Sequence, residues 1–131
     1  LKNDLVELFM AAHDQTLDQV KIETDGRFAA TIVAVSGGYP NEYKKGLPIY
    51  LEYLENPEAI KHIDEDGGVM VFHAGTQKRG DEILTNGGRV LAVSALADTL
   101  GESIELSKET LEQIHFDGMY YRNDIGYEFI D

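Results

Sequence analysis

The chain has 131 residues, enough for one domain with a single modest core, and it contains no cysteine, which excludes disulfides, thiolate metal sites and a cysteine nucleophile. Its formal net charge of −13 repels polyanions on average, so nucleic acid is not expected as a partner. No apolar run approaches the roughly 18 residues that span a bilayer, so a membrane partner is not expected either.

The sequence opens with a short predicted helix over residues 4–13. Its apolar residues recur at i, i+3, i+4 and i+7: Leu5, Leu8, Phe9 and Ala12. The stretch is not a signal peptide, because Glu7 and His13-Asp14 interrupt it. The chain lacks an initiator methionine, so we expect Leu1 to lie inside a longer protein and the helix to pack against a part of that protein.

A series of short strands follows the helix. Residues 28–35 are nearly all apolar or β-branched, which predicts a strand covered on both faces. The apolar runs and glycine turns after it predict an edge strand at 47–51, a helical turn plus loop at 56–68, strands at 69–73, 83–85 and 89–95, and a hairpin turn at 77–82.

A longer helix is predicted after the last strand. Thr99 and Glu102 have the spacing of a capping box, and an apolar stripe follows at Leu100, Ile104, Leu111 and Ile114. The helix is expected to end near His115, whose position favours a capping role at the helix C-terminus. Short strands close together in sequence favour antiparallel pairing. We therefore predict an α+β fold, with a small antiparallel sheet or half-barrel and flanking helices.

Three predicted strands stop at glycine turns that expose backbone N–H groups. The turns are Ser36-Gly37-Gly38-Tyr39-Pro40, His73-Ala74-Gly75-Thr76 and Asn86-Gly87-Gly88-Arg89. Such turns bind anions because successive amides point at one oxygen cluster, and an arginine clamps phosphate with two parallel hydrogen bonds. None of them matches the phosphate loop of nucleotide-binding proteins or the dinucleotide fingerprint. The residues alone therefore indicate an anion-binding surface whose ligand stays open.

Each feature of that surface also has a purely structural interpretation. The glycines simply make turns, Arg89 pairs with a carboxylate, and Lys44 and Lys45 are ordinary surface charges. His73 is either an acid, base or phosphate donor, or a side chain that holds the strand end through its ring nitrogens. The spacing of His73, Asp117 and Asp124 does not match a metal-ligand pattern, so no metal site is expected within the chain.

Five segments, taken together, resemble the end of phosphoribosylamine–glycine ligases, and the resemblance runs along nearly the whole chain. In family order and spacing they are Ser36-Gly37-Gly38-Tyr39-Pro40, Phe72-His73-Ala74-Gly75-Thr76, Thr85-Asn86-Gly87-Gly88-Arg89-Val90-Leu91, Ile114-His115-Phe116-Asp117-Gly118 and Arg122-Asn123-Asp124-Ile125-Gly126. The opening Asp4-Leu5-Val6-Glu7-Leu8 resembles the helix that follows the family's ATP-grasp metal-binding stretch.

The resemblance implies a cytoplasmic ligase of purine biosynthesis that joins phosphoribosylamine and glycine while ATP, with Mg²⁺, becomes ADP and phosphate. It implies that residues 1–18 end an ATP-grasp domain and that residues 19–131 form the C-terminal β-rich domain, a hybrid β motif. The family's Arg-Phe-Gly-Asp-Pro-Glu signature is absent from this sequence. We therefore expect the N-terminal and ATP-grasp domains to lie outside the chain, and the chain alone to hold neither ATP nor Mg²⁺ and to be inactive.

The resemblance also places the phosphoribosyl substrate beside this domain. Asn86, Gly87, Gly88 and Arg89, with Lys44 and Lys45, are then expected to bind its 5′-phosphate. The loops expected on the substrate side contain Ser36, Gly37, Gly38, Tyr39, His73, Gly75 and Thr76. The alternative is a stand-alone module that binds a small anion or carries a group on Lys78, although Lys78 lacks the flanking residues of biotinyl and lipoyl carriers.

Overall fold

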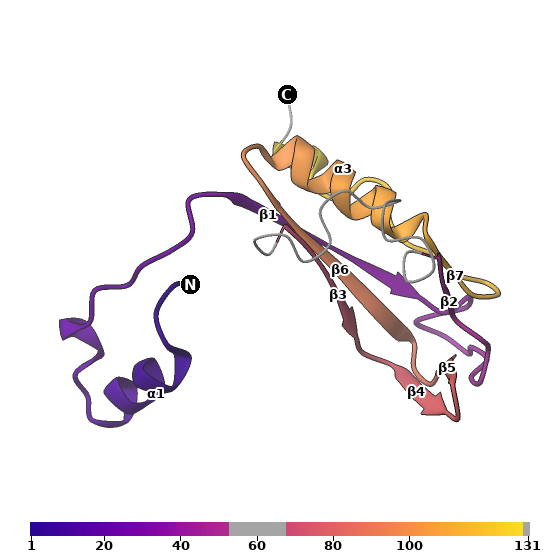
Figure 1. The fold of residues 1–131 in the computed structure, drawn as a ribbon, viewed down its shortest axis with the longest axis horizontal. Coiled ribbons are helices and arrows are strands. Elements are labelled where there is room, and N and C mark those ends of the chain that lie inside the picture. Colours follow the sequence, from indigo (N-terminus) through magenta and orange to yellow (C-terminus); the bar gives the residue numbers. More distant parts are fainter. Residues whose placement is uncertain (53–67, 130–131) are drawn as a thin grey trace.

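The computed structural model of the chain describes residues 1–52 and 68–129 (Figure 1). The helical turn and loop expected at 56–68 fall almost wholly outside the described residues. In chain order the elements are α1 (Leu5–His13), η1 (Leu17–Gln19), β1 (Phe28–Val35), β2 (Tyr50–Leu51), β3 (Val69–His73), β4 (Thr76–Arg79), β5 (Glu82–Thr85), β6 (Arg89–Ala97), α3 (Leu100–Leu111), β7 (Ile114–His115) and η3 (Tyr127–Phe129).

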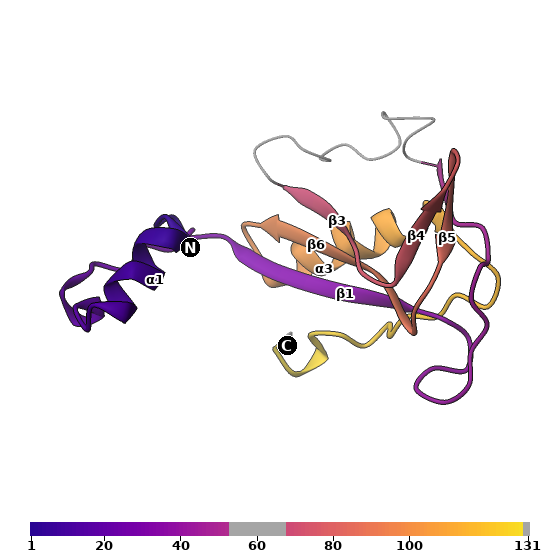
Figure 2. The same ribbon diagram turned by 90° about the horizontal axis from the view of Figure 1, so that it is seen from below.

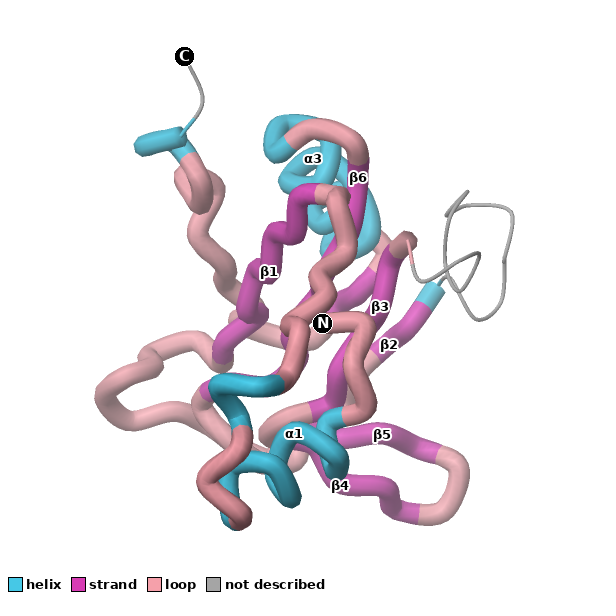
Figure 3. Tube along the Cα trace, turned by 90° about the vertical axis from the view of Figure 1, so that its left-hand side faces the viewer, coloured by secondary structure: helices cyan, strands magenta, loops and turns pink. Residues whose placement is uncertain are grey.

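Three antiparallel pairings organise the strands. The largest sheet has the order β1-β6-β3, with β6 in the middle, and Figure 3 shows its strands side by side. Two small ribbons, β2-β7 and β4-β5, adjoin it. The predicted α+β class with antiparallel sheets is confirmed.

The core lies between the large sheet and α3. Along β1, Ala30, Ile32 and Ala34 are buried, whereas Thr31 and Val33 between them are exposed. The expectation that β1 is covered on both faces is therefore wrong for the described residues. The reason is that α3 covers one face of the sheet and no second described element covers the other (Figure 1).

Helix α3 begins as its capping residues predict and ends earlier than its apolar stripe suggests. The Thr99 hydroxyl accepts a hydrogen bond from the Glu102 N–H at 3.2 Å. Small buried side chains let the helix approach the sheet, and the Ser107 hydroxyl donates to the Ala30 carbonyl at 3.3 Å. The helix stops at Leu111, and Ile114–His115 leaves it to form β7.

The pairing of β7 with β2 corrects the expected role of His115. His115 lies opposite Tyr50 in the ribbon, and its Nε2 lies 3.2 Å from Oε1 of Glu52. It therefore contacts a carboxylate across the ribbon and does not cap α3. Ile114 and Leu111 are both buried in the core, although Leu111 ends α3 and Ile114 belongs to β7. Their helical spacing therefore does not mean that they share one helix.

The stretch 47–51 is extended, but it has two partners. Its first part pairs with β5, where the Ile49 N–H donates to the Ile83 carbonyl at 2.8 Å, and only Tyr50–Leu51 pairs with β7. The hairpin turn is also shorter than expected. Thr76–Arg79 is a strand, and the chain reverses at Gly80-Asp81, with Gly80 at φ +61°. The sequence did not predict this strand, because its residues are polar and do not alternate between buried and exposed positions.

Helix α1 stands apart from the sheet (Figures 1 and 2). Asp4 caps it by accepting from the Val6 and Glu7 N–H groups, and Leu8 is its buried residue. Backbone and side-chain hydrogen bonds tie residues 2–3 to residues 21–23 and close this segment on itself. In the described part of the chain, no helix is both long and apolar enough to cross a membrane.

We expect α1 to be weakly protected in the isolated chain. Its apolar side chains Leu5, Val6, Phe9 and Met10 are 53–67% exposed, and a short helix without tertiary contacts is marginal in water. Amide hydrogen exchange should therefore be fast across residues 4–12. Protection equal to that of β1, measured on a proven monomer, would show that α1 is stable without a partner.

Candidate functional site

The three glycine turns meet at one end of the large sheet. The turn after β1 reaches the turn before β6 through Ser36, whose N–H donates to the Gly88 carbonyl at 2.8 Å and whose hydroxyl donates to the Gly87 carbonyl at 2.9 Å. Ser36 is 2% exposed, so this tie is shielded from water. The end of β1 therefore fixes the backbone just before Arg89.

The turn after β3 joins the same cluster through its backbone. The Asn86 N–H donates to the Gly75 carbonyl at 2.7 Å, and the Gly75 N–H donates to the Arg89 carbonyl at 2.8 Å. A Cβ at Gly75 would lie 2.7 Å from the Gly87 Cα, a distance that real Cβ atoms do not tolerate. The two chain segments cross here at a separation that only glycine permits.

A fourth glycine turn, around Gly118, joins the cluster, and the sequence did not assign this glycine to the site. A Cβ on Gly37 would lie 2.8 Å from the carbonyl oxygen of Gly118, in the loop after β7. The sequence analysis had singled out the segment Ile114–Gly118, but it could not show that this segment lies beside Gly37. Gly118 has φ +71°, so its backbone conformation also favours glycine.

The turn before β6 contains two backbone N–H groups without a described acceptor. In residues 1–52 and 68–129, neither Gly87 nor Gly88 donates its N–H to an acceptor. Gly87 is half-buried, whereas Gly88 is buried and the Tyr39 ring occupies the space where its side chain would project. Of the two, the Gly87 N–H is therefore the candidate donor to a ligand, and Gly88 lets the Tyr39 ring pack closely.

Arg89 lies at an apolar crevice of about 320 Å³ beside this turn. The crevice is lined by Thr31, Ile32, Val33, Val35, Tyr39, Arg89, Tyr120, Tyr121, Arg122 and Ile125. Arg89 is exposed and makes no ion pair with any described carboxylate. The tail residues Tyr120 and Ile125 were not expected at the site, although the closing segment Arg122–Gly126 had been singled out in the sequence.

The second arginine of the crevice is neutralised by a neighbour. Arg122 donates from Nε and from an Nη to the two carboxylate oxygens of Asp124, both at 2.8 Å. These hydrogen bonds lower the pKa of the Asp124 carboxyl and raise that of Arg122, so both stay charged and paired at neutral pH. An anion entering the crevice therefore meets an available guanidinium at Arg89.

Lys44 and Lys45 lie on a different side of the glycine cluster. Lys44 lines a separate cleft of about 470 Å³ together with Gly37, Glu42, Tyr43, Leu47, Asp117 and Gly118. Lys45 places its Nζ 6.0 Å from the centre of the Tyr43 ring. Lys44 thus lines a different hollow from Arg89, and two carboxylates share that hollow with it.

His73 and Thr76 bond to each other at the end of β3. Nδ1 of His73 lies 3.1 Å from Oγ1 of Thr76, across the turn that contains Gly75. This contact agrees with the interpretation that His73 holds the strand end through a ring nitrogen. Both side chains are accessible enough for a ligand to replace that contact, since His73 is exposed and Thr76 half-buried.

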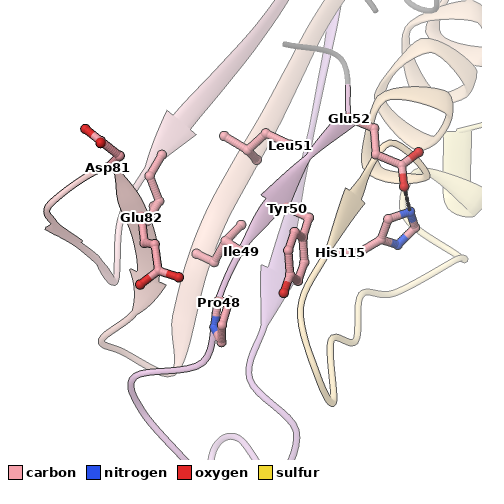
Figure 4. Close-up of a pocket in the computed structure, with 9 residues that line it drawn as sticks. Pro48, Ile49, Tyr50, Leu51, Glu52, Asp81, Glu82 and His115 are labelled. Atoms are coloured by element: carbon pink, nitrogen blue, oxygen red, sulfur yellow. Dashed lines mark ion pairs between the residues drawn. The ribbon is translucent and has the colours of Figure 1, made fainter. Parts of the chain in front are cut away.

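Another hollow among the described residues is acidic and lies away from the glycine cluster (Figure 4). It measures about 630 Å³ between β2, the β4-β5 hairpin and His115. Glu52, Asp81 and Glu82 border it, and Figure 4 shows the His115–Glu52 contact at one side. Three carboxylates disfavour a phosphate here, so this hollow does not compete with the Arg89 crevice for an anion.

The described residues do not fit a site for Mg²⁺ with a nucleotide. No group of three His, Asp or Glu side chains that could hold a metal exists within 1–52 and 68–129. The cations near the glycine cluster are separated, since Lys44 and Arg89 line two different hollows and Lys45 lies near the Tyr43 ring. This chemistry suits a single small anion better than a triphosphate with its metal.

Comparison with known proteins now assigns the family. The model of the family described as "Phosphoribosylglycinamide synthetase, C domain" matches residues 29–128. The chain belongs to this family. Its described crevice and glycine cluster therefore lie in a C domain of the phosphoribosylglycinamide synthetase type.

Relatives extend the similarity over the whole chain. A phosphoribosylamine–glycine ligase of Vibrio vulnificus (strain YJ016) is 43% identical over 130 residues, which is 99% of this chain and 28% of the relative. The bifunctional purine biosynthetic protein ADE1 of Schizosaccharomyces pombe is 37% identical over 131 residues, or 100% of this chain and 15% of that protein. This C domain thus spans well under a third of the relatives it matches.

A solved structure shares the fold. The crystal structure of the phosphoribosylamine–glycine ligase of Thermotoga maritima superposes with a TM-score of 0.65 and 31% sequence identity. The match covers 90% of this chain and 27% of that protein. The small antiparallel α+β fold is therefore the fold of this C domain in a full-length ligase.

Proposed function

We propose that this C domain works within a full-length phosphoribosylamine–glycine ligase and holds the phosphoribosylamine substrate by its 5′-phosphate. The full-length enzyme joins phosphoribosylamine to glycine while ATP becomes ADP and phosphate. In this proposal other domains hold the nucleotide and its Mg²⁺, because the family's ATP-grasp signature is absent from this sequence. Residues 1–18 form the end of the preceding domain and residues 19–131 the C domain proper.

One observation carries the assignment of the phosphate. Arg89 forms no ion pair with a described carboxylate, and it lies beside a turn whose Gly87 N–H has no acceptor among the described residues. A guanidinium fork and a backbone amide are the donors that phosphate oxygens accept most favourably. The buried Ser36 tie and the Gly75 crossing hold this backbone in place before the ligand arrives. Such preorganisation raises affinity because less ordering is needed on binding.

The other residues that the sequence assigned to the site have smaller roles in this proposal. Asn86, Gly88 and Tyr39 shape the turn, while His73 and Thr76 border it from the end of β3. Lys44 and Lys45 are secondary candidates, since Lys44 lines another hollow and Lys45 lies near the Tyr43 ring. A carrier function is less well supported, because Lys78 lies within β4 and the hairpin tip is Gly80-Asp81.

A nucleotide titration tests whether ATP binding lies outside this chain. The isolated chain should give a flat calorimetric titration with Mg-ATP and no ligase activity, because the ATP-grasp signature is absent from its sequence. Full-length ligase under the same conditions serves as the positive control. Micromolar binding of Mg-ATP to the 131-residue chain would show that nucleotide-binding parts exist within it and would contradict the proposal.

A further inference from the structure

The turn before β6 contains the single asparagine–glycine step of the sequence, Asn86-Gly87. In such a step the backbone nitrogen of the second residue can attack the side-chain carbonyl carbon of the asparagine. Glycine favours this attack, because it has no Cβ to hinder the approach and its backbone adopts many conformations. The step lies in the turn to which we assign the substrate phosphate, so a chemical change there bears on that site.

Both reacting groups of this step are unengaged. The Asn86 side chain is exposed and makes no hydrogen bond with a described residue. The Gly87 N–H has no acceptor within residues 1–52 and 68–129. An amide that already donates a hydrogen bond must break it before its nitrogen can attack, whereas this amide has none to break. The N–H that the proposed function offers to a phosphate therefore belongs to the nucleophile of a side reaction.

The hydrogen bonds of the turn lie on either side of the reacting groups. The Asn86 N–H donates to the Gly75 carbonyl at 2.7 Å, and the Gly87 carbonyl accepts from the Ser36 hydroxyl at 2.9 Å. These bonds restrain the backbone rotation at Asn86 that ring closure requires, but they engage neither the side-chain amide nor the Gly87 nitrogen. The folded turn is therefore expected to react more slowly than a free peptide of the same sequence.

We propose that Asn86 is a deamidation site and that a phosphate bound at the turn protects it. In the first step the Gly87 nitrogen bonds to the Asn86 side-chain carbon, loses its proton and expels ammonia, which closes a succinimide ring. In the second step water opens the ring at one of its two carbonyls, and residue 86 becomes aspartate or isoaspartate. Water is the only co-reactant. The protection rests on the proposed function, since it needs a phosphate on the Gly87 N–H, whereas the deamidation does not.

Deamidation damages the phosphate site in two ways. Either product places a carboxylate next to Gly87 and close in sequence to Arg89, where it repels a phosphate and competes with it for the guanidinium. Isoaspartate also routes the main chain through the former side chain and lengthens it by one carbon, which displaces the Gly87 N–H. The Michaelis constant for phosphoribosylamine should therefore rise several-fold in the deamidated enzyme. Substrate that occupies the site preserves it.

Peptide mapping of the full-length ligase after incubation at mildly alkaline pH tests the site. Trypsin releases residues 80–89 as one peptide, in which Asn86 is the only side-chain amide. The peptide 28–44 likewise contains Asn41 as its only side-chain amide. Asn41 is the matched comparison, because it is exposed and the Glu42 N–H after it has no acceptor within 1–52 and 68–129, but Glu42 carries a Cβ.

Asn86 should gain the mass of deamidation at least several-fold faster than Asn41. Asn86→Ser has no amide at this position, so this variant should keep more of its own starting activity over the same incubation than the unsubstituted ligase does. Equal rates at Asn86 and Asn41 would overturn the modification site. Equal fractional losses of activity in Asn86→Ser and the unsubstituted ligase would overturn the damage assigned to it.

The same incubation with ribose 5-phosphate tests the protection, and ribose is the control that lacks the phosphate. Ribose 5-phosphate should slow the deamidation of Asn86 several-fold and leave Asn41 unchanged, whereas ribose should slow neither. The protection should be lost in Arg89→Ala. Deamidation that ribose 5-phosphate does not slow would overturn the protection and the phosphate role of the Gly87 N–H, while the modification site would stand. An unreactive Asn86 would remove the modification site without affecting the role of Arg89, so the two proposals can fail separately.

Discussion

Replacing Arg89 by alanine in the full-length ligase is expected to raise the Michaelis constant for phosphoribosylamine by about 10- to 150-fold, which corresponds to a lost charge-assisted contact of roughly 1.5–3 kcal/mol. Because Arg89 makes no ion pair with a described residue, its removal leaves no buried carboxylate without a partner. The melting temperature should therefore hold. The Michaelis constants for glycine and ATP should hardly change.

Arg122→Ala is the matched control for this variant. Arg122 lines the same crevice, but Asp124 occupies its guanidinium through two hydrogen bonds. Its removal should raise the constant for phosphoribosylamine far less than Arg89→Ala does. A lower melting temperature for Arg89→Ala with unchanged substrate kinetics would instead assign Arg89 to the scaffold.

Gly75→Ala is expected to cause a large loss of stability, because the added Cβ overpacks the crossing of two glycine turns. A Cβ at this position would lie 2.5 Å from the Arg89 carbonyl oxygen and 2.7 Å from the Gly87 Cα, both backbone atoms that cannot rotate away. Overpacking of this kind costs roughly 1–3 kcal/mol or more. The melting temperature of the isolated chain should fall by roughly 4–15 °C. Thermal unfolding followed by circular dichroism measures the shift.

Gly101→Ala is the control for that loss. Gly101 lies in the first turn of α3, where an added Cβ meets nothing within 4 Å. Alanine is favoured over glycine in a helix by up to about 1 kcal/mol, so this variant should melt at the same or a higher temperature. Equal melting temperatures for Gly75→Ala and the unsubstituted chain would show that the two turns do not cross as closely as described.

The sequence predicted the helices and strands that have at least one buried, apolar face. The strands β1, β3 and β6 and the start of α3 follow from their apolar residues and from the capping pair Thr99 and Glu102. The prediction failed where the local residue pattern does not match the position that the segment takes in the fold. Thr76–Arg79 has no apolar alternation, yet it pairs with β5, and Ile114 continues the helical spacing although it belongs to β7.

The error at β1 has a different origin. Its β-branched outer residues Thr31 and Val33 suggested burial on both faces, and the described residues cover one. A run of apolar and β-branched residues favours a strand, but it does not by itself show how many of the strand's faces are covered.

The turns of the site could be predicted from the sequence, but their positions relative to one another could not. The glycine and arginine content singled out the three turns, because such backbone favours anions. Their meeting depends on long-range contacts, such as Ser36 with Gly87 and Gly37 with Gly118, that sequence spacing does not encode. For the same reason the sequence grouped the lysines with Arg89, whereas the fold places Lys44 in a separate cleft.

The most direct test of the central claim compares substrates with and without the 5′-phosphate. The ratio of kcat/KM for phosphoribosylamine to kcat/KM for ribosylamine measures how much the phosphate contributes to transition-state binding. If Arg89 holds the phosphate, this ratio should fall by about 10- to 150-fold in Arg89→Ala relative to the unsubstituted ligase, since ribosylamine never used the contact. An unchanged ratio, with both substrates affected alike, would show that Arg89 does not bind the phosphate.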